Sequence, residues 1–127
     1  MYLPCEVVLK TVLPNIRALV AKELSEKYRM KQVEIAQVLG ISQSAVSMYL
    51  TGNRGTAIDL GKNKDIYDKI ELLSKRIFDR SLTQEEYISR VCEICKIVRG
   101  KGLLCQVHRQ YLKPFELKEC SYCLNKV

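Results

Sequence analysis

Hydrophobic residues recur at helical spacing in five stretches of the chain. The first stretch has one apolar face, formed by Ile16, Leu19, Val20 and Leu24. Such a face is typical of a helix that packs one side against a core. The same spacing predicts helices over residues 15–27, 31–39, 43–50, 64–80 and 83–99. We therefore predict an all-α fold.

Residues that start or stop helices support these limits. Pro14 suits the first position of a helix, and Gly40 and Gly52 are typical stop residues. Ser42 is expected to cap the helix that follows it. Thr83, three residues before a glutamate, predicts a capping box at the start of the last helix.

The segment 52–64 carries Gly, Asn, Thr and charge, and it is interpreted as a loop or linker. It suggests three segments, at residues 1–57, 58–91 and 92–127. The first holds 7 basic and 4 acidic residues, the second 7 and 7, and the third 7 and 3. The net charge of +7 is thus divided between the two ends, which suits a polyanionic partner without identifying one.

Residues 32–51 fit a helix-turn-helix. Two short helices that cross steeply need a small residue at the crossing, which Ala36 supplies, and a turn that tolerates positive φ, which Gly40 supplies. The apolar positions expected to face inward are Ile35, Leu39, Ile41, Val46 and Tyr49. We predict a helix-turn-helix DNA-binding domain within residues 1–57.

The opposite side of the second helix carries short, mostly uncharged side chains. They are Ser42, Gln43, Ser44, Ser47, Met48 and Thr51. A purely structural helix would usually carry Lys, Glu or Arg there. Gln pairs bidentately with an adenine edge, Ser bonds to several base edges, and a helix N-terminus offers N–H groups to phosphate. The pattern indicates a helix that enters the major groove of double-stranded DNA.

The sequences QVEIA at residues 32–36 and GISQSAVS at residues 40–47 resemble the lambda-repressor-like (XRE) helix-turn-helix regulators. The resemblance implies that Gln32 clamps a phosphate and braces Gln43, and that Ser44 reads a base edge. It also implies that Thr51, Asn53 and Arg54 lie along the DNA backbone. The alternative is that the helix pair serves only as a structural core or as a protein-interaction module, as in a coactivator or antitoxin-like adaptor.

A longer run looks like a subgroup of predicted archaeal regulators: PCE at residues 4–6, LP at 13–14 and RALVAKEL at 17–24. Some members of that subgroup carry a thiamin-phosphate-synthase-like ligand domain. This chain has a cysteine-rich tail in its place, so binding of a thiamin-type ligand is not carried over. No small-molecule substrate is expected.

Three pairs of potential metal ligands share one internal spacing. They are Cys92 with Cys95, Cys105 with His108, and Cys120 with Cys123. Two side chains three residues apart converge on one ion from a single turn, and a zinc ion or an iron–sulfur cluster takes four ligands. Five cysteines are available, with His108 as a substitute.

The excess of thiols and the lack of a second histidine favour an iron–sulfur cluster over zinc. A metal-free dithiol switch is the third hypothesis. Alternatively, Cys95 could simply pack as a small apolar side chain. Cys5 stands alone and is expected to be a small buried hydrophobe. Loss or oxidation of a cluster would shift the helix that begins at Thr83, which makes the chain a redox or iron sensor in this hypothesis.

The remaining features limit the class of protein. No apolar run reaches the length of about 20 residues that a membrane helix needs, and residues 1–6 lack the pattern of a signal peptide. A cytoplasmic protein is expected. His108 is the sole histidine, and neither a phosphate loop nor a nucleophile–base signature is found, so an enzyme is not expected.

A single helix-turn-helix contacts few base pairs, and specificity normally requires a two-fold dimer. The hydrophobic stripe of Ile66, Ile70, Leu73 and Ile77 is wider than so small a monomer needs. We therefore expect the helices of segment 58–91 to form a homodimer. The alternative is that the stripe packs only on the chain's own N-terminal domain.

Overall fold

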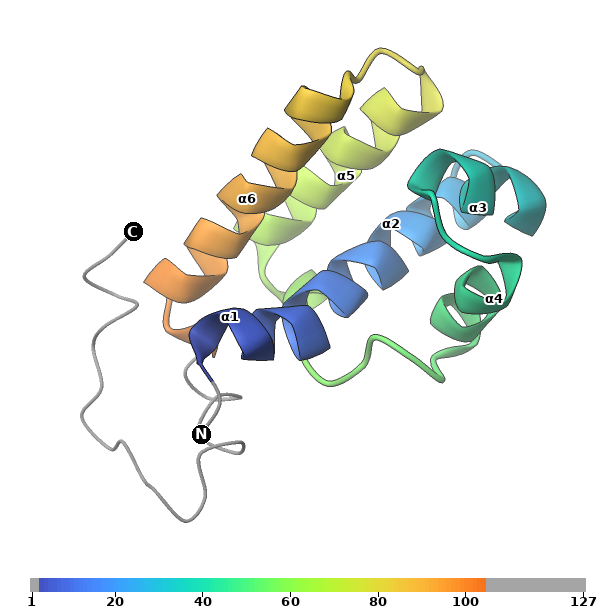
Figure 1. Cartoon of the computed structure of the whole chain (residues 1–127). Coiled ribbons are helices and arrows are strands. Elements are labelled where there is room, and N and C mark those ends of the chain that lie inside the picture. Colours follow the sequence, from blue (N-terminus) through green and yellow to red (C-terminus); the bar gives the residue numbers. More distant parts are fainter. Residues whose placement is uncertain (1–2, 105–127) are drawn as a thin grey trace.

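A computed structural model describes residues 3–104, and these residues contain helices and no strand. The prediction of an all-α fold is confirmed for this part of the chain. The helices are α1 (Pro4–Val7), η1 (Val8–Val12), α2 (Leu13–Glu26), α3 (Gln32–Leu39), α4 (Gln43–Thr51), η2 (Leu60–Lys62), α5 (Lys64–Phe78) and α6 (Gln84–Gly100). In Figure 1, α2 runs through the middle of the molecule, with α3 and α4 on one side and the α5–α6 hairpin on the other.

The first helix is longer than predicted, because α1, η1 and α2 follow one another without a break from residue 4 to residue 26. Pro14 lies near the start of α2 and has no backbone N–H to donate to the turn before it. The preceding turn is a π-helix, in which the Leu13 N–H bonds to the carbonyl of Val8. The proline therefore lies inside a continuous helical rod instead of opening it.

A single hydrophobic core joins α2 to both sides of the molecule. Ile16, Val20 and Leu24 of α2 are buried, as predicted from their spacing. The same cluster of contacts includes buried residues from α3, α4, α5 and α6. The predicted boundary near residue 57 is therefore crossed by one continuous core.

The segment between α4 and α5 was predicted to be a loop or linker, and that prediction is only partly right. It contains the short 3-10 helix η2, and Leu60 is fully buried in the core. The segment is bonded to α2 through Asn15, whose amide contacts both Gly55 and Leu60. It is thus part of the packed structure.

The α5 stripe predicted to form a dimer interface is covered by the chain itself. Ile66, Ile70, Leu73 and Ile77 are exposed by at most 8 %. The expectation that this stripe is wider than the monomer needs is therefore wrong, because the N-terminal helices and α6 already cover it. Homodimerisation itself stays a prediction.

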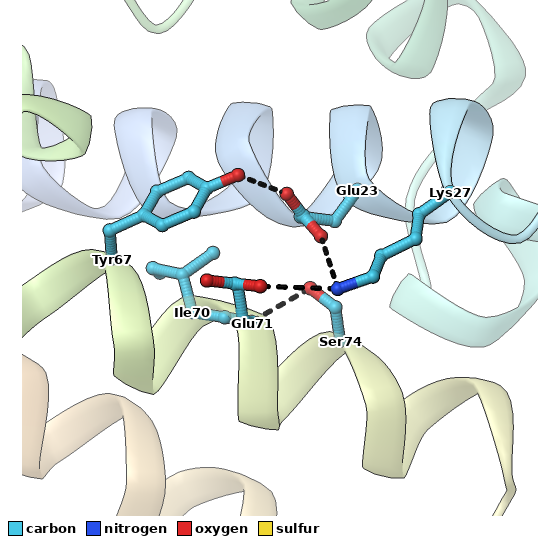
Figure 2. Close-up of polar contacts among 6 residues, drawn as sticks. All are labelled: Glu23, Lys27, Tyr67, Ile70, Glu71 and Ser74. Carbon is cyan, nitrogen blue, oxygen red and sulfur yellow. Dashed lines mark hydrogen bonds and ion pairs between the residues drawn. The ribbon is translucent and has the colours of Figure 1, made fainter.

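A polar network joins the outer edges of α2 and α5 (Figure 2). The Tyr67 hydroxyl donates to the Glu23 carboxylate, and Lys27 bonds to Glu71 at 3.1 Å. The hydrogen bond to Glu23 raises the pKa of Tyr67 to about 12. The side chain of Glu23 is 13 % exposed, so this carboxylate depends on protein donors more than a surface carboxylate would.

We expect Tyr67→Phe to lower the free energy of unfolding at pH 7 by about 1 kcal/mol, because the Glu23 carboxylate loses its donor. A pKa raised above the ordinary value of 10.0 favours the folded state below that pH, and this contribution disappears as the pH rises towards 12. The difference between wild type and variant, measured by urea denaturation, should therefore shrink from pH 9 to pH 12. An unchanged difference across this range would contradict the assignment.

Candidate nucleic-acid interface

The helices α3 and α4 are joined by the three residues 40–42, whose backbone has the predicted geometry. Gly40 adopts a left-handed conformation with φ of 67° and ends α3. The Ser42 hydroxyl accepts the N–H of Ala45 at 3.1 Å and so caps α4. At the other end of α4, Gly52 is also left-handed, with φ of 79°. Both ends of α4 are therefore fixed by local contacts.

The inner side of this helix pair belongs to the core. Ile35, Val46 and Tyr49 are exposed by at most 2 %, and Ala36 by 8 %. The other two predicted inward residues, Leu39 and Ile41, are half-buried and pack against the same core. The inward pattern predicted from the sequence is confirmed, and it fixes which side of α4 is left outside.

The outer face of α4 consists of Gln43, Ser44, Ser47, Met48 and Thr51. Ser47 is half-buried and the other four are exposed. Within the described part of the chain, Gln43 and Ser44 make no side-chain hydrogen bond or ion pair. Thr51 bonds only to the backbone of the preceding turn and to Asn53. The donors and acceptors of Gln43 and Ser44 are thus free for a partner.

Polar and basic residues flank this face. Asn53 donates to the Thr51 hydroxyl at 3.1 Å, and Arg54 lies over the ring of Tyr49, with its guanidinium carbon 5.7 Å from the ring centre. Gln32 is half-buried at the start of α3. Among the described residues, no hydrogen bond joins Gln32 to Gln43, so the bracing implied by the family resemblance is absent here.

The electrostatics of this region differ from those of the rest of the structure. Residues 35–58 contain no acidic residue. Ion pairs in the described chain join Lys27 to Glu71, Lys69 to Glu93, Arg76 to Glu86 and Lys101 to Asp65. These four pairs lie on α2, α5 and α6 or just after α6, and two further pairs join Lys27 to Glu23 on α2 and Lys62 to Asp59 at η2. The α4 region therefore carries no negative charge of its own to repel a polyanion.

The two predicted metal ligands on α6 share one side of the helix. Cys92 is exposed and Cys95 is half-buried. Burial, and secondarily the neighbouring Cys92, raises the pKa of the Cys95 thiol above its ordinary value. Cys105, His108, Cys120 and Cys123 lie outside the described residues. Within residues 3–104, no three potential ligands meet.

The remaining cysteine corrects one expectation. Cys5 was predicted to be a buried hydrophobe, and it is exposed on α1. It lies in the first turn of the four-residue helix α1, at the start of the rod. Helical spacing alone does not show this, because α1 extends beyond the helix that the sequence predicted.

Sequence reasoning missed Asn15, which bonds to the segment after α4. Asn15 sits beside Ile16 on α2 and is 6 % exposed. A polar amide among the apolar positions of an amphipathic helix was the available signal, since buried amides are nearly always hydrogen-bonded. Its partners, 40 and 45 residues away, were not predictable from spacing.

Comparisons with protein-family models, with curated proteins and with solved structures find no match to this chain. No helix within residues 3–104 is both long and apolar enough to span a membrane.

Proposed function

We propose that the chain is a sequence-specific DNA-binding transcriptional regulator in which α3 and α4 form a helix-turn-helix. The observation that carries the proposal is the outer face of α4. Its exposed Gln43 and Ser44 have no partner in the described chain, while the inner side of the same helix is buried. Their amide and hydroxyl groups are open to solvent, and the edge of a base pair can replace the bound water with direct hydrogen bonds.

In this proposal α4 enters the major groove of double-stranded DNA by its N-terminal end. Gln43 bonds to an adenine edge and Ser44 to a neighbouring base. Ser42, Ser47 and Met48 line the contact. Small side chains allow close approach of the helix, and the absence of acidic residues from positions 35–58 removes repulsion by phosphate. The family resemblance, the cytoplasmic location and the lack of enzymatic activity remain part of the proposal.

Residues on either side of α4 would hold the DNA backbone. Gln32 lies in the first turn of α3, whose N-terminus is capped by Glu34, so its side-chain amide is the group that would contact a phosphate. Thr51, Asn53 and Arg54 follow the C-terminal end of α4. Such contacts fix the register of the protein on the duplex, and the contacts of Gln43 and Ser44 then select sequence.

Selection from a pool of random duplexes tests the DNA-binding proposal. The full chain should enrich a common sequence after a few rounds. Two copies of that sequence in opposite orientation, about 10 base pairs apart, would also support the expected homodimer. Equal binding of all duplexes, or no binding at all, would contradict the proposal and favour an adaptor role.

We also propose that Cys92 and Cys95 supply two ligands of an iron–sulfur cluster, with zinc as the alternative. The donor set on α6 fits, because both thiols lie three residues apart on one helix and one of them is exposed. The other ligands would come from Cys105, Cys120 and Cys123, with His108 as substitute. A bound cluster would supply a redox-sensitive link, and α6 would pass a change to α4 through α5 and α2, whose residues share one core.

Anaerobic purification with analysis for iron, sulfide and zinc tests the metal proposal. We expect iron and sulfide in equal amounts, a visible absorption band, and loss of both in Cys92→Ser and Cys95→Ser. The matched control is Cys5→Ser, because this exposed cysteine lies outside the proposed ligand set. One zinc per chain would favour the structural alternative, and a metal-free chain would leave the dithiol switch.

A further inference from the structure

Asn15 joins α2 to the segment that follows α4. Its amide nitrogen donates to the carbonyl of Gly55 at 2.7 Å, and its amide oxygen accepts the N–H of Leu60 at 3.0 Å. The side chain is buried, so water does not replace either partner easily. One side chain thus fixes both ends of residues 55–60 against the middle of the molecule.

The backbone of this segment approaches α2 so closely that only glycine fits at position 55. Gly55 has a left-handed φ of 78°, and a Cβ there would lie 2.6 Å from the carbonyl oxygen of Pro14. It would also lie 3.1 Å from the Cβ of Ala18. The contact of Asn15 and the close approach of Gly55 therefore hold residues 53–56 in one place relative to α2 and α4.

A hollow of about 190 Å³ lies between this segment and α2. Lys22 of α2 and Arg54 contribute two cations to its lining, and Thr56 contributes a hydroxyl. Within the described chain neither cation has an ion pair. The acidic residue in the lining, Asp59, is bonded to the N–H of Gly61 and lies 4.0 Å from Lys62. The hollow therefore presents an excess of positive charge.

Arg54 is also held relative to the recognition surface. Its guanidinium lies over the ring of Tyr49, and Tyr49 lines the hollow from α4 with 2 % exposure. A cation over a buried ring loses less conformational freedom when it binds an anion than a mobile surface arginine does. The hollow and the outer face of α4 are thus fixed to the same short helix.

We propose that this hollow binds a phosphate of the DNA backbone, with Lys22 and Arg54 as its cations and Asn15 as the residue that positions Arg54 through its bond to the neighbouring Gly55. The inference rests on the proposed function and deepens it, because it adds a contact from α2 to those expected from α3 and α4. The occupant is a phosphodiester, since the lining offers cations and a hydroxyl but no base-reading amide free of other bonds.

The salt dependence of binding to the selected duplex tests the phosphate contacts. Each phosphate contact contributes about 0.9 to the slope of log K against log salt, which is about fivefold in affinity at about 0.15 M salt. We expect Lys22→Gln and Arg54→Gln each to lower the slope by about this amount. The matched control is Lys75→Gln, an exposed lysine on α5 that does not line the hollow. Equal slopes for Lys22→Gln and Lys75→Gln would overturn the proposal.

A double-mutant cycle tests the role of Asn15. Asn15→Ala should weaken binding about as much as Arg54→Gln, and the double variant should lose little more than either, because both act on one contact. Asn15→Ser, which keeps a small uncharged polar group at this position, serves if the alanine variant does not fold. The control for stability alone is Ser74→Ala, which removes a buried hydroxyl from α5 and should leave binding unchanged.

The outcomes separate this inference from the proposed function. The positioning role of Asn15 would be overturned if the binding losses of Asn15→Ala and Arg54→Gln added up in the double variant. It would also be overturned if Ser74→Ala weakened DNA binding. If wild-type protein selects no common sequence, the proposed function fails. The same slopes are then measured on a random duplex, where a direct phosphate contact still contributes its full share. Equal salt slopes for wild type and Lys22→Gln on the random duplex would also overturn the hollow as a phosphate site.

Discussion

Replacing Gln43 and Ser44 together by alanine is expected to weaken binding to the selected duplex by about ten- to a hundredfold and to flatten its sequence preference. A good bidentate pair with a base edge, which Gln43 can form, contributes about 1–3 kcal/mol of discrimination, or about 5- to 150-fold. Both side chains are exposed and without partners in the described chain, so the folded state loses no contact on truncation. Competition between selected and scrambled duplexes, at one fixed salt concentration, measures the effect.

The chain offers a matched control for this double variant. Gln84 and Ser89 are exposed on α6, and their replacement by alanine removes the same chemical groups from another helix. This control should bind like wild type, and both variants should keep the thermal midpoint. A loss of affinity shared by both variants, or an unchanged preference in the first, would contradict major-groove insertion of α4. Binding to random duplexes should change little, because it depends on phosphate contacts.

The parts of the fold that were predicted correctly depend on contacts between near neighbours in sequence. Ser42 and Thr83 each accept a backbone N–H three residues later, and Gly40 ends α3 by its left-handed backbone. These interactions need only four or five consecutive residues, so the residue types alone predict them. The ends of α3, α4 and α6 were therefore placed to within one residue by sequence.

Contacts between distant residues were beyond the same reasoning. Leu60 lies in a stretch rich in Gly, Asn and charge, which predicts a loop, yet it is fully buried. Its N–H bonds to Asn15, 45 residues earlier. The π-helical turn before Pro14 likewise depends on how α1 and α2 pack, and the local residue pattern does not predict it. Periodicity shows that a residue faces the core but does not show which distant residues it contacts there.

The candidate site shows the same division. The outer face of α4 was predicted because an inward pattern on a short helix also fixes which residues face outward. The hollow beside Arg54 was not predicted, because it requires Gly55 to approach α2 within contact distance. The implied brace between Gln32 and Gln43 came from family resemblance, and the described structure contains no such hydrogen bond.

The second large effect is expected on the free energy of unfolding, when a residue of the buried α5 stripe is truncated. Ile70 is fully buried against the chain's own helices, whereas Leu72 on the same helix is 45 % exposed. We expect Ile70→Ala to lower the free energy of unfolding by about 2–5 kcal/mol, because it removes buried methyl groups and leaves a cavity. Leu72→Ala is the matched control and should cost about 0.5 kcal/mol or less.

The concentration dependence of unfolding decides which surface Ile70 stabilises. If Ile70 packs within one chain, the loss caused by Ile70→Ala is the same at low and high protein concentration in urea denaturation. An interface residue would instead stabilise the dimer, so its replacement would cost little where the chain is monomeric and more as the protein is concentrated. A homodimer remains compatible with the first result, but its interface must then lie outside the α5 stripe. The exposed apolar side chains of the described chain, such as Leu72 and Ile88, are the positions at which to look for it.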